Sequence, residues 1–120
     1  MFTRLVFILA IAFGSFASGT AAQEPLPTRV LFVGNSYLYY NDSLHNHVER
    51  MAVERYANYV DSPFEFKSAT IGGAKLMHHN IDWLLTPSQI GMDRPFQVVI
   101  MQGASFEPLA PESRRTFLDT

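Results

Sequence analysis

Short apolar runs separated by helical segments are the feature of this sequence that most restricts its fold. Residues 30–33 (VLFV) are apolar throughout and are followed by Gly34, which predicts a strand over residues 29–33 that is buried on both faces. Residues 96–101 predict a further strand, apolar throughout its middle. Residues 64–68 alternate apolar and polar side chains, and with residues 69–71 they predict a strand near a sheet edge.

The segments between these strands have helical patterns. From Asp42, which we expect to be an N-cap, apolar residues recur at helical spacing as far as residue 59. A second helix is predicted over residues 74–85, with His79 and Trp83 on its apolar face, and a third begins at Pro111. Strands that alternate with helices predict an α/β fold in which a parallel sheet has helices on both faces, because parallel strands need right-handed crossovers.

The first residues have the layout of a secretory signal peptide. Arg4 precedes an apolar run over residues 5–13, and small residues follow up to Ala22. We expect a signal peptide over residues 1–22 that is cleaved near Ala22, a spacer over 23–28 and a folded domain over 29–120. The apolar run is shorter than the roughly 20 residues of a membrane-spanning helix, so we expect a secreted or periplasmic protein without a stable membrane span.

Length and composition exclude several classes of function. The chain has 120 residues, enough for one ordinary domain. Lys and Arg number 9 against 11 Asp and Glu, which gives no basic surface for nucleic acid. The absence of cysteine removes disulfides, thiolate metal sites and cysteine nucleophiles. His45 and His47 lie two apart on a predicted helix and point in different directions, so we predict no metal site.

The three predicted strands all end in loops that could carry chemistry. These loops are residues 34–37 (GNSY), 72–73 (GG) and 102–105 (QGAS). Ligands of parallel α/β sheets bind outside the carboxyl ends of the strands. The three loops are therefore expected to converge on one rim that forms the functional site.

Three short motifs, in this order, carry a resemblance to a known family. They are VGNSY (33–37), IGG (71–73, followed by Leu76 and His79) and VIMQ (99–102, followed by Ser105 and Pro108). They resemble the first three blocks of the SGNH, or GDSL-type, hydrolases, in the branch that has Gly-Asn-Ser-Tyr where the namesake members have Gly-Asp-Ser-Leu. Three motifs in order at strand ends are more specific than any one of them.

The resemblance implies a three-layer, SGNH-hydrolase or flavodoxin-like fold and an exported esterase or deacetylase for a small ester or an acylated carbohydrate, with no cofactor. Ser36 would be the nucleophile, and the N–H groups of Ser36 and Gly73 with the Gln102 amide would donate to the oxyanion. Residues that would line the site are Asn35, Tyr37, His79 and Ser105. The family's general base lies in a late Asp-x-x-His block, so the chain is expected to correspond to an N-terminal half.

Other interpretations remain beside this one. A Gly-Asn-Ser sequence after a buried strand is also ordinary turn chemistry, and His79 and Tyr37 could serve only packing. A binding remnant would keep the rim without the base. A flavodoxin-like nucleotide binder would use the same rim, although its phosphate loop should be richer in glycine and hydroxyl residues. The oligomeric state is left open.

Overall fold

The computed structural model describes residues 25–119, which form a three-stranded parallel sheet with the strand order β2-β1-β3. The strands are β1 (Arg29–Gly34), β2 (Glu65–Thr70) and β3 (Val98–Met101). The α/β class is thus confirmed, and so is the edge position of the strand over residues 64–71. The expected signal peptide, residues 1–22, lies outside the described residues, as do the first two residues of the spacer. No helix within residues 25–119 has the length and apolar character to cross a membrane.

Strand β1 is the centre of the fold, because it pairs with both other strands. Its alternate side chains enter two separate cores, one on each face of the sheet. Val30 and Phe32 belong to one core, while Leu31 and Val33 belong to the other and are fully buried. A strand buried on both faces explains why residues 30–33 contain no polar residue.

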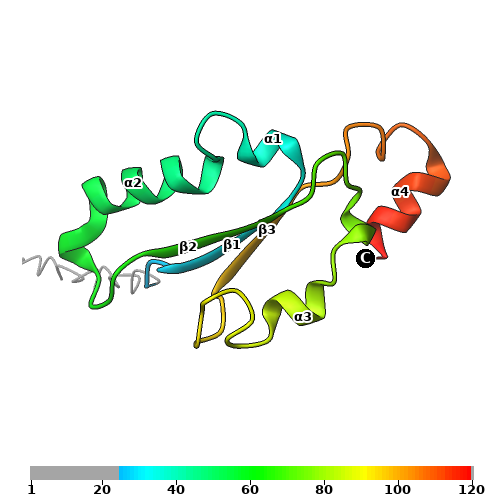
Figure 1. Ribbon diagram of the computed structural model, residues 1–120. Coiled ribbons are helices and arrows are strands. Elements are labelled where there is room, and N and C mark those ends of the chain that lie inside the picture. The colour runs from blue at the N-terminus through cyan, green and yellow to red at the C-terminus, as the bar shows by residue number, and fades with distance from the viewer. Residues whose placement is uncertain (1–24, 120) are drawn as a thin grey trace, which may run out of the picture.

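The core around Phe32 is covered by α1 (Ser36–Tyr39) and α2 (Leu44–Tyr56), and the 3₁₀ turn η1 (Ala57–Tyr59) follows α2. Figure 1 shows α1 and α2 above the sheet. Leu38 is buried here, and Val48 and Ala52 pack against the same core.

The core around Leu31 is covered from the opposite face by the 3₁₀ turn η2 (Leu76–His78), α3 (Ile81–Leu85) and α4 (Pro111–Leu118). Leu76 and Leu84 are buried here, and Phe117 packs against this core from α4. Helical elements on both faces confirm the layered arrangement expected from the alternating pattern (Figure 1).

The helix predicted over residues 74–85 is wrong, because the segment is split into η2 and α3. The side chain of Asn80 accepts a hydrogen bond from the backbone N–H of Trp83 at 3.1 Å, and this cap starts a new helix. The break turns Trp83 away from the core, so that it is 48% exposed instead of buried as predicted.

The predicted start of the long helix is also wrong. α2 begins at Leu44 with Ser43 as its N-cap residue, and Asp42 has a positive φ of 67°. The Asp42 carboxylate instead pairs with Arg50 at 2.6 Å. Only part of the helix face that was predicted to be apolar packs on the sheet, since Met51 on that face is 71% exposed.

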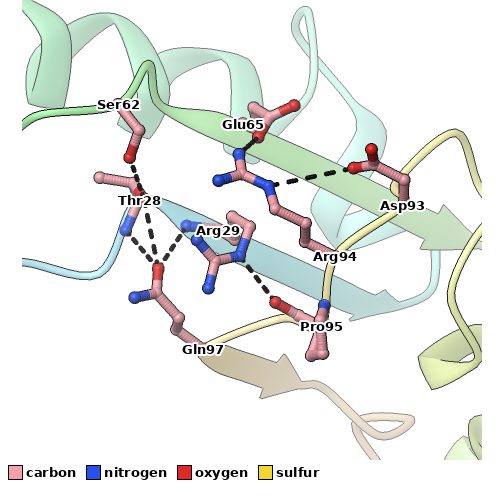
Figure 2. A network of polar contacts seen from close by, with 8 residues as sticks. All are labelled: Thr28, Arg29, Ser62, Glu65, Asp93, Arg94, Pro95 and Gln97. Carbon is pink, nitrogen blue, oxygen red and sulfur yellow. Dashed lines mark hydrogen bonds and ion pairs between the residues drawn. The ribbon is translucent and has the colours of Figure 1, made fainter.

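The side chain of Gln97 joins the segment before β3 to the amino end of β1. Gln97 Oε1, just before β3, accepts from the backbone N–H groups of Thr28 and Arg29 at 2.8 and 3.0 Å (Figure 2). Arg29 Nε in turn donates to the Pro95 oxygen at 2.7 Å. These bonds and the bond from Gln97 N to Arg29 O at 2.9 Å hold the segment before β3 against β1, and β3 itself begins at Val98 and not at residue 96 as predicted.

Candidate functional site

The carboxyl ends of the three strands meet at one edge of the sheet. Gly34 pairs with Thr70 of β2, and Val33 pairs with Met101 of β3. The alignment continues beyond the strands, since Ile71 N donates to Gly34 O at 3.1 Å and Gln102 N donates to Val33 O at 2.8 Å. The three loops that the sequence placed on one rim are therefore neighbours.

Asn35 joins all three loops through its side chain. Asn35 Nδ2 donates to the backbone oxygen of Ala74 at 3.1 Å and to that of Gly103 at 3.2 Å. Its Oδ1 accepts from Tyr37 N at 3.2 Å, which caps α1. Asn35 is 3% exposed, so these bonds form away from solvent. Asn35 was predicted only to line the site, whereas its hydrogen bonds place it at the centre of the rim.

Gln102 adds a second link between the first and third loops. Its Oε1 accepts from Asn35 N at 3.3 Å, and its Nε2 donates to the oxygen of Gly103. An amide nitrogen carries two hydrogens, so one N–H of Gln102 remains beyond the bond to Gly103.

Gly34 is needed at this junction for space. A Cβ added there would lie 2.7 Å from Leu38 Cδ1 and 2.8 Å from Gln102 Oε1. Gly34 does not have a positive φ, so it is not present to allow the left-handed backbone conformation of a turn. Its missing side chain lets α1 and Gln102 close over the end of β1.

Ser36 is the first residue of α1 and is half-buried at the rim. Its backbone oxygen accepts from Tyr40 N at 3.2 Å. Within residues 25–119, its hydroxyl has no hydrogen-bond partner. The Ser36 hydroxyl thus makes no hydrogen bond and belongs to the residue that follows Asn35, which joins the three loops.

Gly73, on the second loop, is exposed and has a φ of +70°. A Cβ added there would meet nothing within 4 Å, so the space above Gly73 is open to a ligand. The neighbouring Gly72 has Tyr39 above it, since a Cβ on Gly72 would lie 3.1 Å from the Tyr39 hydroxyl. Tyr39 was not among the predicted site residues, because only the backbone path of the second loop brings Gly72 beneath α1.

His79 lies under the rim and not on its surface. It is 9% exposed and hydrogen-bonds to the Gly34 backbone. Burial lowers its pKa from the ordinary 6.5, more than the Gly34 bond raises it. Its Nε2 is buried and has no partner in the described part of the chain. His79 is therefore a neutral imidazole that supports the end of β1, beside a shallow cavity lined in part by Trp83.

The remaining predicted residues lie at the edge of the site. Tyr37 is 67% exposed on α1. Ser105 is exposed and lines a cavity between the third loop and α4. In residues 25–119, the structure has no cluster of three or more His, Cys, Asp or Glu side chains that could hold a metal ion.

Comparisons with known proteins do not assign the fold or the site to a family. No match was found among protein-family models, curated proteins or solved structures. What the structure defines is an α/β protein with a three-stranded parallel sheet, whose strand-end loops are joined at Asn35.

Proposed function

We propose that this chain carries the acyl-transfer site of an exported SGNH-type serine hydrolase that acts on a small ester or an acylated carbohydrate. One observation carries the proposal: Asn35 binds the loops of the second and third motifs, and the next residue is Ser36, with an uncommitted hydroxyl. The order of the three motifs and the signal-peptide layout of residues 1–22 support it.

The proposed chemistry begins with Ser36 Oγ attacking the ester carbonyl while its proton passes to a general base. The carbonyl oxygen gains negative charge and accepts hydrogen bonds from the N–H groups of Ser36 and Gly73 and from the free N–H of Gln102. Each such donor contributes about 100- to 1000-fold in rate. The alcohol then leaves with a proton, and water hydrolyses the acyl-enzyme.

No histidine within residues 25–119 hydrogen-bonds to Ser36. Asp42 and His45 have the Asp-x-x-His spacing, but Asp42 is paired with Arg50. His45 packs near Phe32, with ring centroids 6.4 Å apart. The resemblance implies instead a base from an Asp-x-x-His block of the kind that the family carries late in its chain.

Labelling of the full-length protein with a fluorophosphonate tests the proposal. The expected result is a covalent adduct on Ser36, identified by peptide mass spectrometry, together with loss of labelling and of short-chain aryl ester hydrolysis in Ser36→Ala. Ser88→Ala is the matched control, since Ser88 is an exposed serine outside the three strand-end loops and should keep both properties. Full esterase activity in Ser36→Ala would overturn the nucleophile assignment.

A second candidate is a binding protein that uses the same rim without catalysis. The observation that favours it is that no histidine within residues 25–119 hydrogen-bonds to Ser36. Such a protein would leave Ser36 unlabelled by the fluorophosphonate and would still bind an acylated sugar, as measured by calorimetry.

A further inference from the structure

A cavity of about 460 Å³ lies between the third loop and α4, coloured orange and red in Figure 1. Its volume falls in the range of small-molecule sites, about 300 to 1000 Å³. None of Ser36, Gly73 and Gln102 lines it, so the cavity is separate from the proposed acyl-transfer site. Much of its wall is apolar, with contributions from Ala104, Pro108, Phe117 and Leu118.

One carboxylate stands in this apolar wall. Glu107 lines the cavity and is only 2% exposed. Its Oε2 accepts a hydrogen bond from Ala104 N, and no ion pair within residues 25–119 joins the carboxylate to a Lys, Arg or His side chain. Burial of a carboxylate is costly unless a cation or several hydrogen-bond donors compensate its charge. A cationic ligand would supply the compensation that the described part of the chain does not.

Gly103 leaves a space beside the carboxylate. A Cβ added at Gly103 would lie 2.6 Å from Glu107 Oε2 and 2.8 Å from Cε2 of the Phe117 ring, so both groups border the same part of the cavity. A carboxylate next to an aromatic ring suits a ligand that has a charged end and an apolar end. The carboxylate would bind the ammonium group of such a ligand through charge-assisted hydrogen bonds, and the ring would pack against its carbon chain.

Arg114 is the other charged residue of the cavity wall, but its side chain is exposed to solvent. Water and dissolved salt screen the charge of Arg114, whereas the charge of Glu107 acts at short range in apolar surroundings. The buried negative charge therefore decides the sign of the occupant, and it favours a cation over an anion.

We propose that this cavity binds an amphipathic organic cation of the primary alkylammonium class, with the ammonium group on the Glu107 carboxylate and the alkyl chain against Phe117 and Leu118. The proposal depends on the cavity alone and does not require the proposed hydrolase activity. A neutral alcohol of the same length would lose the ion pair, and Glu107 would repel a carboxylate of the same length.

The first test compares four ligands by titration calorimetry of the full-length protein. Hexylammonium should bind at least tenfold more tightly than 1-hexanol, which lacks the charge, and than methylammonium, which lacks the chain. Hexanoate should show no measurable binding. Equal affinities for hexylammonium and hexanol, a preference for hexanoate, or no binding of hexylammonium would each overturn the proposal.

The second test removes the charge and keeps the shape of the side chain. Glu107→Gln retains an oxygen that can accept from Ala104 N, and it should weaken hexylammonium binding at least tenfold while hexanol binding stays within about twofold. Glu112→Gln is the matched control, because Glu112 is exposed in the first turn of α4 and does not line the cavity. The control should bind hexylammonium within about twofold of the unchanged protein. Equal affinities of Glu107→Gln and the unchanged protein would remove Glu107 from the site.

Arg114→Gln distinguishes a cation site from an anion site in the same cavity. Hexylammonium should bind this variant at least as tightly as the unchanged protein, because a like charge has been removed. Hexanoate binding that is lost in Arg114→Gln and kept in Glu107→Gln would overturn the proposal in favour of an anion site. Circular dichroism verifies that each variant folds, and if Glu107→Gln does not fold, the comparison of the four ligands on the unchanged protein decides.

Discussion

Asn35 Nδ2 lies 3.1 Å from the backbone oxygen of Ala74, so a side chain from the end of β1 holds the loop that follows β2. The same nitrogen holds the loop after β3 through Gly103 at 3.2 Å. Two carbonyl oxygens converge on one nitrogen, and only a donor with two hydrogens satisfies both. This requirement explains why residue 35 has an amide side chain.

Asn35→Asp should destabilise the protein by about 2 to 4 kcal/mol, because a carboxylate oxygen would face two carbonyl oxygens that lose their donor. Chemical denaturation at neutral pH measures this loss. The loss should shrink as the pH falls, since repulsion from the carbonyls raises the pKa of the new carboxyl group and its protonated form can donate one hydrogen bond.

Asn58→Asp is the control for this change, because Asn58 is exposed in η1. It should alter the unfolding free energy by less than about 0.5 kcal/mol. An equal loss in both variants would show that Asn35 does not hold the loops together.

Gly73→Ala and Gly91→Ala form a matched pair. Both glycines have a φ near +70°, and neither has an atom within 4 Å of an added Cβ. Each change should cost about 1 kcal/mol of unfolding free energy through left-handed backbone strain. Only Gly73→Ala should also lower kcat/KM of the proposed ester hydrolysis, since its methyl group would enter the space proposed for the substrate. Equal kcat/KM values would remove Gly73 from the proposed site.

Gln97→Ala should destabilise the protein by about 1 to 3 kcal/mol, because the backbone N–H groups of Thr28 and Arg29 lose their acceptor. Gln97→Glu keeps that acceptor and should recover most of the loss. Gln89→Ala is the control, since the Gln89 side chain is exposed and makes no hydrogen bond within the described residues. Urea denaturation of the three variants tests the ranking.

The stability of the protein should fall as the pH drops below about 6.5. Burial lowers the pKa of both His79 and His45 from 6.5 in the folded state, so the unfolded state binds more protons in this range. The stabilising contribution is complete above 6.5 and is lost as the pH falls toward the folded-state pKa values. His79→Gln should reduce the slope of stability against pH.

The parallel sheet and its edge strand could be predicted because they follow from local patterns. The continuous apolar run over residues 30–33 indicates a strand that is buried on both faces. The alternation over residues 64–68 indicates a strand that is buried on one face. The break at Asn80 was missed because apolar spacing continued through it, and one side-chain cap outweighed that spacing.

The central position of Asn35 could not be predicted from the sequence. The two acceptors of its hydrogen bonds are backbone oxygens 39 and 68 residues away. Every residue type has a backbone oxygen, so the residue types do not indicate which oxygens accept these bonds. The convergence of the three loops was predictable from the topology, whereas the group that joins them was not.

Both ends of the sheet are held by uncharged amides, Gln97 at one end and Asn35 with Gln102 at the other. Amides do not titrate, and dissolved ions screen them far less than they screen an exposed ion pair such as Arg94 with Glu65. Brine and fresh water should therefore leave the spacing of the strand ends nearly unchanged, whereas acid acts on the carboxyl ends through the buried imidazole of His79.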